Sequence, residues 1–152
     1  MSYKQYDTYE STLEYALKLI NKYDYTVHKL TVKLKSKKIN DDLIDTVIKF
    51  LINKKLLDDY RYALDYVDLC LSKLKGENYI KQKLINKGVN SLIIDKAISE
   101  INPNVLNENL IALSKILLNK YKNNYSKVIN SLISRGYSYS KIKEIINCEV
   151  EL

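Results

Sequence analysis

The sequence predicts an all-α protein, built as an elongated, curved array of three tandem three-helix repeats. Three observations support this fold class. The 152 residues include only three glycines and one proline, and a scarcity of residues that interrupt helices favours long helical segments. One apolar pattern recurs three times along the chain. Residues of the types preferred at helix N-caps, which are Ser, Thr, Asn and Asp, stand where the helices of each copy should begin.

The recurring pattern is a leucine, two spacers, a basic residue, a turn residue, an apolar residue and a helix-capping residue. It begins at Leu34, Leu84 and Leu132, so that successive copies are offset by 50 and 48 residues. Apolar residues stand four positions before each leucine, and four and eight positions after each capping residue: Leu30, Ile80 and Val128, then Ile44, Ile94 and Ile142, then Ile48, Ile98 and Ile146. An Ala-Leu pair also recurs upstream at a less regular distance: Ala16-Leu17, Ala63-Leu64 and Ala112-Leu113. Spacings of four and eight place residues on one helical face, and units of this size become stable when stacking gives them a shared core.

The repeat divides the chain into two tails and three units, which we place at residues 1–10, 11–56, 57–102, 103–147 and 148–152. The first unit should open with a capping box of Ser11 and Glu14. The second should open at Asp58, and Pro103 should mark the boundary before the third. The nine predicted helices are 11–22, 26–37, 40–53, 58–74, 77–86, 90–100, 107–121, 125–134 and 138–147.

The turn after each second helix also follows the pattern. Gly88 and Gly136 come directly after the basic residue that ends that helix. Glycine adopts a left-handed C-cap conformation without steric cost, so we expect both glycines in this conformation. Lys38 holds the equivalent place in the first unit, and we therefore expect that turn to be built differently.

The sequence offers no constellation for catalysis or metal binding. His28 is the only histidine, and Cys70 and Cys148 are far apart, so no spacing typical of a metal site occurs. The pair Asp58-Asp59 stands at a helix start and is best explained as a cap. Three glycines cannot make a phosphate-cradling loop. We therefore predict a protein that is not an enzyme and that has no catalytic residue, metal or cofactor.

The charge points to a partner. The chain has a net charge of +7, which favours polyanions or acidic protein surfaces. The candidate partner-binding residues are the basic side chains of the three units: Lys29, Lys33, Lys37, Arg61, Lys73, Lys75, Lys81, Lys83, Lys87 and Arg135. Those on the second helices stand four residues apart and would form a basic track along the array. The alternative explanation is that they are the solvated faces of amphipathic helices.

Two further expectations follow from composition. Only two residues are arginine and two are glutamine, so sequence-specific reading of DNA bases is not expected, whereas lysine contacts to phosphates are. No stretch approaches the ~18 apolar residues of a membrane span, and the N-terminus has no signal-peptide core. We predict a cytoplasmic protein with reduced cysteines that acts as a monomer.

Short motifs in the middle unit suggest a family. They are Asp59-Tyr60-Arg61-Tyr62-Ala63, Tyr66-Val67, Lys75-Gly76, Ile80-Lys81-Gln82-Lys83-Leu84 and Lys87-Gly88-Val89. The outer units add Ala16-Leu17, Tyr25-Thr26, and Leu132 with Arg135-Gly136-Tyr137. Together these residues resemble the RecX regulatory family over about residues 11 to 147. The chain departs from that family at Asp68, Leu69 and Cys70, where an arginine is common, and at Lys83, where an acidic residue is usual.

The resemblance implies a bacterial cytoplasmic regulator in DNA repair, recombination and the SOS response. Its partners would be the recombinase RecA and the RecA–single-stranded DNA filament, whose strand exchange and ATP hydrolysis such proteins typically inhibit. Weak direct DNA binding would be compatible with this role. Two other classes stay open: a non-specific nucleic-acid-binding helical module, and a repeat scaffold for some other protein.

Overall fold

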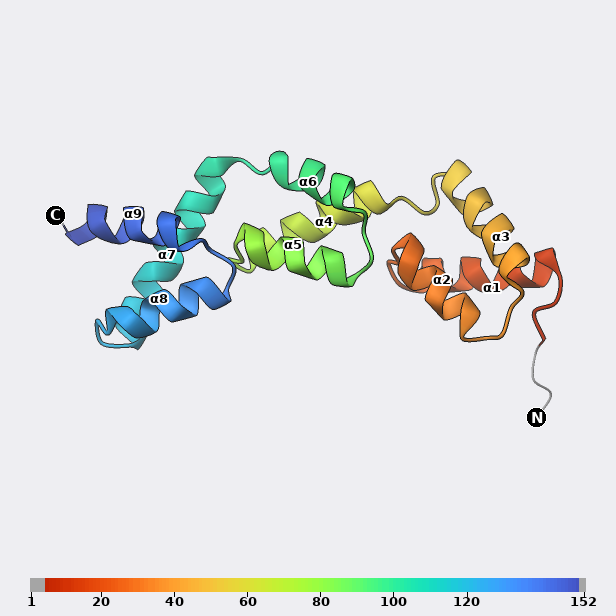
Figure 1. Cartoon of the computed structure of the whole chain (residues 1–152), viewed down its shortest axis with the longest axis horizontal. Coiled ribbons are helices and arrows are strands. Elements are labelled where there is room, and N and C mark those ends of the chain that lie inside the picture. Colours follow the sequence, from red (N-terminus) through yellow and green to blue (C-terminus); the bar gives the residue numbers. More distant parts are fainter. Residues whose placement is uncertain (1–4, 151–152) are drawn as a thin grey trace.

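The protein folds into consecutive α-helices with no strand among residues 5–150, which are the residues that the computed structural model describes. Figure 1 shows these helices as an elongated array in which three groups of three follow one another from the N-terminal to the C-terminal end. The predicted all-α fold class is therefore confirmed. The helices are α1 (Tyr9–Lys22), α2 (Val27–Lys35), α3 (Asp41–Asn53), α4 (Asp59–Ser72), α5 (Glu77–Asn86), α6 (Ser91–Ser99), α7 (Pro103–Lys120), α8 (Tyr125–Ser134) and α9 (Tyr139–Val150).

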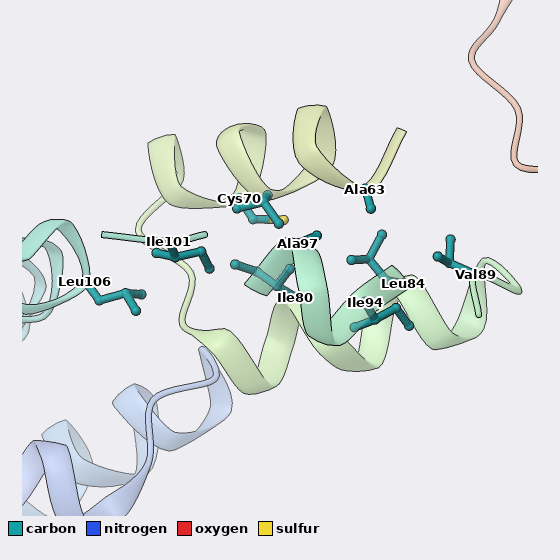
Figure 2. Close-up of a cluster of buried hydrophobic side chains, with 10 residues drawn as sticks. Ala63, Cys70, Ile80, Leu84, Val89, Ile94, Ala97, Ile101 and Leu106 are labelled. Atoms are coloured by element: carbon teal, nitrogen blue, oxygen red, sulfur yellow. The ribbon is translucent and has the colours of Figure 1, made fainter. Parts of the chain in front are cut away.

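Each group of three helices has its own apolar core. Leu34, Leu84 and Leu132, the residues that define the repeat, are fully buried in the first, second and third core respectively. The residues four positions before them are also fully buried. Figure 2 shows the second core, where side chains of α4, α5 and α6 converge and Leu106 reaches in from α7. The apolar register read from the sequence is thus the register of the cores. The residue boundaries proposed for the three units stay a prediction.

The turn after each second helix contains a residue with positive φ in all three units. Gly88 and Gly136 have φ values of 76° and 98°, as expected, and Lys38 has a φ of 59°. The amide of each donates to the carbonyl three residues before it, at 2.9 Å. The rest of the first turn is built differently, as expected. The amides of Val89 and Tyr137 donate to the carbonyls of Leu84 and Leu132 at 3.1 and 3.2 Å, whereas the corresponding bond is missing at Ile39 and helix α2 has its C-cap two residues before Lys38. Lys38 also holds a conformation that costs a side-chain-bearing residue more than glycine.

Several helix ends differ from the sequence prediction by one to four residues, including those of α1, α7 and α9. Helix α1 starts at Tyr9, because Thr8 is its N-cap and Ser11 completes the capping box as the third helical residue. Helix α7 starts at Pro103, since proline at the first helical position forfeits an amide that would have no helical partner. Helix α9 continues to Val150 and takes in part of the predicted C-terminal tail. Residues 1–4 and 151–152 of the two predicted tails lie outside the described residues.

The Ala-Leu pair does not keep its register in the third unit. Ala16 and Ala63 are fully buried against their cores, whereas Ala112 is exposed and Leu113 is buried in its place. The face of α7 that packs on the core is thus shifted by one residue relative to the sequence alignment.

The second helices of the three units, α2, α5 and α8, meet end to end (Figure 1). The carbonyl of Lys87, the C-cap of α5, accepts a 2.7 Å bond from Oγ1 of Thr26, the N-cap of α2. In the same way the carbonyl of Arg135, the C-cap of α8, accepts a 2.8 Å bond from the amide of Gly76, the N-cap of α5. A negative helix C-terminus therefore faces a positive N-terminus at both junctions, and polar groups left over at helix ends find partners.

The two junctions differ in how much apolar surface they bury. Between the second and third units, Leu106 of α7 joins the second core, and the hydroxyl of buried Tyr137 donates to the Leu74 carbonyl at 3.0 Å. Between the first and second units, no core cluster of the described residues has members from helices α1–α3 as well as from helices α4–α6. That junction depends on polar bonds, including a 2.8 Å bond from the Val27 amide to Oδ1 of Asp59.

We predict that Gly76→Ala destabilises the protein. A Cβ at residue 76 would collide with the backbone carbonyl of Gly136, which cannot move without separating the units. The ordinary negative φ of Gly76, −89°, means that the loss would report this close approach and not backbone strain. The expected loss is about 1 to 3 kcal/mol in urea unfolding. Asn130→Ala, at an exposed position in α8, is the control, and equal stability of both variants would contradict the close contact.

A second prediction concerns the Asp59 carboxylate at the first junction. Burial raises its pKa above 3.8, with the Val27 amide bond acting in the opposite direction. A folded-state pKa above the unfolded value means that the folded state binds more protons, so this group's contribution to stability falls as pH rises through that window. Asp59→Asn keeps an oxygen acceptor for Val27 without a buried charge.

We therefore expect Asp59→Asn to be at least as stable as the wild type at neutral pH, with its advantage shrinking below pH 3.8. Urea denaturation, followed by circular dichroism at neutral pH and below pH 3.8, measures the difference in unfolding free energy between the variant and the wild type. Asp68→Asn, at an exposed position of α4, corrects for the general effect of removing a carboxylate. A variant that is clearly less stable at neutral pH would show that attraction to the α2 N-terminus outweighs the cost of burial.

Candidate partner-binding surface

Tyrosine and lysine side chains interleave on one side of α4 and α5. Six residues form this tyrosine–lysine cluster: Tyr62, Tyr66, Lys75, Tyr79, Lys83 and Lys87. The Lys87 ammonium lies 5.0 Å from the ring centre of Tyr66 and 5.8 Å from that of Tyr62. Lys75 and Lys83 lie 4.6 Å and 5.3 Å from the ring centre of Tyr79. Ammonium groups at these distances are attracted to the negative faces of the rings.

Helical spacing explains how the cluster forms. Tyr62 and Tyr66 are four residues apart on α4, and their rings lie nearly parallel, with centres 6.3 Å apart. Tyr79, Lys83 and Lys87 are also spaced by four along α5 and its C-cap, so they form one stripe. Because α4 packs against α5, the stripe meets the tyrosine pair.

The pKa values show how charge is distributed in the cluster. Burial raises the pKa of Tyr66 to about 12, with further contributions from Cys70 and the neighbouring tyrosines. Burial also raises the pKa of the Cys70 thiol, although the Tyr66 hydrogen bond and Lys73, Lys75 and Lys87 lower it. Tyr66 and the thiol are therefore neutral near pH 7, and the positive charge of this surface comes from its lysines.

The structure separates the ten basic residues that the sequence nominates. Lys75, Lys83 and Lys87 join the cluster, and Lys73 lies close enough to act on the same thiol. Lys81 points to another side of α5, because its ammonium pairs with Asp95 of α6 at 3.0 Å. Arg61 pairs with Asp65 at 4.0 Å. Arg135 is half-buried at the second junction.

Lys29, Lys33 and Lys37 form a separate basic stripe at α2. All three are exposed, and none forms an ion pair with another residue of the described chain. In the repeat register they correspond to Tyr79, Lys83 and Lys87, so α2 and α5 present basic residues at matching positions. Whether the basic residues contact a partner stays a prediction.

A groove between the first and second units was not predicted. Its volume is about 380 Å³, and we call it the inter-repeat groove. Three of its lining residues are strongly exposed apolar side chains, Tyr23, Leu56 and Leu69, with exposed fractions of 57%, 52% and 45%. Tyr62, Tyr66 and Lys87 line it as well, so the groove adjoins the tyrosine–lysine cluster. Sequence periodicity gave no signal for it, because its walls come from the end of α1, the α3–α4 connection and α4.

Within residues 5–150, the structure has neither a metal-binding cluster nor a membrane-spanning helix. No group of three or more His, Cys, Asp or Glu side chains there is placed to hold a metal ion. The His28 side chain lies against Gly88 at the first junction, which gives it a packing role. No helix in this part of the chain combines the length and apolar character needed to cross a bilayer.

Comparison with known proteins gives a consistent result. A family model described as RecX, second three-helix domain, matches residues 58–98. A protein named regulatory protein RecX from Clostridium acetobutylicum is 36% identical over an alignment of 151 residues, and the alignment covers 92% of this chain and 69% of that protein. One of the same name from Vibrio parahaemolyticus is 30% identical, with 93% of each chain covered. The chain spans 64% of a Clostridium tetani relative.

Solved structures agree over the whole array. A crystal structure of RecX from Lactobacillus salivarius superposes with a TM-score of 0.87 and 28% identity, covering 95% of this chain and 97% of that one. A second structure, of a regulatory protein RecX, gives a TM-score of 0.82 and 27% identity over 91% of this chain. The similarity therefore includes the order and relative placement of all three units.

Proposed function

The chain belongs to the RecX family of regulatory proteins, and we propose that it binds RecA and RecA–single-stranded DNA filaments and inhibits their recombinase and ATPase activities. The observation that carries this proposal is the three-unit array itself, which matches a RecX crystal structure along nearly its full length. The role would lie in DNA repair and recombination, within the cytoplasm where such filaments form. It would require a monomer and no cofactor.

An elongated array suits a filament partner. Stacked three-helix units give a long surface, and a filament offers equivalent binding positions at regular intervals. A protein that binds one state of the filament more tightly than another shifts the population toward that state. Inhibition by this route needs no chemistry from the bound protein, because occupancy of the filament is sufficient.

A second candidate function is non-specific nucleic-acid binding by the lysines. The observation in its favour is the exposed stripe of Lys29, Lys33 and Lys37, which has no ion-pair partner among the described residues. Binding of this kind would not need RecA and would weaken steeply with salt, because phosphate contacts release counterions.

We predict that the purified protein lowers the rate of ATP hydrolysis by RecA on single-stranded DNA and sediments with the filaments. ATP turnover and co-sedimentation should show the same dependence on protein concentration, because both report occupancy. The control is the DNA without RecA, measured at low and high salt. An unchanged ATPase rate together with no co-sedimentation would reject the proposal, and tight, salt-sensitive binding to DNA alone would favour the second candidate.

We also predict that charge reversal will locate the basic contacts. Two sets are compared: Lys29, Lys33 and Lys37 to Glu on α2, and Lys83 and Lys87 to Glu on α5. Each set should weaken filament binding more at low salt than at high salt, since exposed charges act through screened attraction. Lys115→Glu on α7, outside the candidate set, controls for net charge. Unchanged binding by both sets would refute the basic track.

A further inference from the structure

Exposed apolar side chains gather where the first and second units meet. Tyr23 follows α1, Leu56 lies in the connection between α3 and α4, and Leu69 belongs to α4, yet all three line the inter-repeat groove. The groove lies where helices α1–α3 and helices α4–α6 have no core cluster in common among the described residues. Apolar surface that folding leaves in a groove is a common site for the anchoring side chain of another protein.

Charged residues continue this surface on one side. The groove shares Tyr62, Tyr66 and Lys87 with the tyrosine–lysine cluster. Lys75, Lys83 and Lys87 have no carboxylate partner within the described part of the chain, whereas nearby Arg61 and Lys81 do. The surface therefore offers apolar contact and, beside it, ammonium groups that a carboxylate of a partner could pair with.

Two features disfavour nucleic acid as the occupant. Asp24, Asp58 and Asp65 line the groove, and they would repel the phosphates of a nucleic-acid backbone laid across it, whereas an apolar side chain entering the groove brings no charge to them. In addition, lysine ammonium groups already lie over the Tyr62, Tyr66 and Tyr79 rings. Bases could stack on those faces only by displacing them. The groove lining combines exposed apolar side chains with charged groups of both signs. Together with lysines that have no carboxylate partner among the described residues, this lining matches a protein segment that carries an apolar side chain beside carboxylates.

We propose that the inter-repeat groove and the tyrosine–lysine cluster form one docking surface for a protein segment that carries a large apolar side chain next to carboxylates. The apolar side chain enters the groove against Leu56 and Leu69, and the carboxylates meet Lys75, Lys83 and Lys87. This inference deepens the proposed function and rests on it where RecA filaments are the probe.

The first arm of the test uses RecA filaments on single-stranded DNA. Leu56→Ala/Leu69→Ala should weaken binding about ten-fold, which is the effect of losing an interface hot spot. The loss in affinity should be the same at low and high salt. Lys75→Gln/Lys83→Gln should weaken it mainly at low salt. The matched controls are Leu92→Ala/Ile116→Ala, which are exposed apolar residues outside the groove, and Lys49→Gln/Lys143→Gln, which are exposed lysines outside the candidate set. Unfolding midpoints confirm that every variant is folded.

The second arm needs no RecA. A synthetic peptide with one leucine flanked by glutamates is titrated while amide resonances of the protein are followed by NMR. We expect amide shifts centred on residues 56–69. These shifts should be absent from the Leu56→Ala/Leu69→Ala variant, and also absent when lysines replace the glutamates of the peptide. No shifts in that region, or the same shifts produced by oligothymidylate, would overturn the docking surface.

The two arms separate the possible failures. If the wild type does not bind RecA filaments but the acidic peptide enters the groove, the proposed function fails and the docking surface stands. If the filaments bind the wild type and the groove variant equally, the docking surface fails and the proposed function stands.

Discussion

The contact on which the array depends is the meeting of one helix C-terminus with the N-terminus of a helix in the preceding unit. The carbonyls of Lys87 and Arg135 each accept a hydrogen bond from an N-cap residue, Thr26 in one case and Gly76 in the other. The Thr26 hydroxyl both caps its own helix and joins the two units. Its Oγ1 accepts a bond from the Lys29 amide and donates one to the Lys87 carbonyl. This contact fixes the direction in which units follow one another, and hence places the residues of α2 and α5 on a common line.

The repeat register could be predicted because packing repeats with it. Leu34, Leu84 and Leu132 recur at positions where any polar residue would cost burial energy, so the pattern persists in sequence. Helix starts were less predictable, because Thr8 and Ser11 are both residue types favoured at N-caps. Only the three-dimensional structure shows at which of them α1 begins. Lys38 shows a related limit. Its left-handed conformation occurs at the position that glycine holds in the other two units, and residue preference alone argues against it.

The candidate surface was only partly predictable for the same reason. Spacing by four indicated that Lys83 and Lys87 share a face, and the structure adds Tyr79 to that stripe. Lys81, two residues away, was nominated with them but pairs with Asp95 on another side of the helix. The inter-repeat groove has no periodic signature at all, because Tyr23, Leu56 and Leu69 come from three segments that only the junction brings together.

The two junctions explain why the groove lies where it does. At the second junction, Leu106 and Tyr137 extend the packing of one unit into the next, so the apolar surface there is buried in the folded protein. At the first junction, polar bonds from Thr26 and Val27 hold the units together without such sharing. Hydrogen bonds of this kind set orientation while adding little net stability. The apolar side chains around this joint consequently stay available, and a partner that fills the groove would also supply the packing that the first junction lacks.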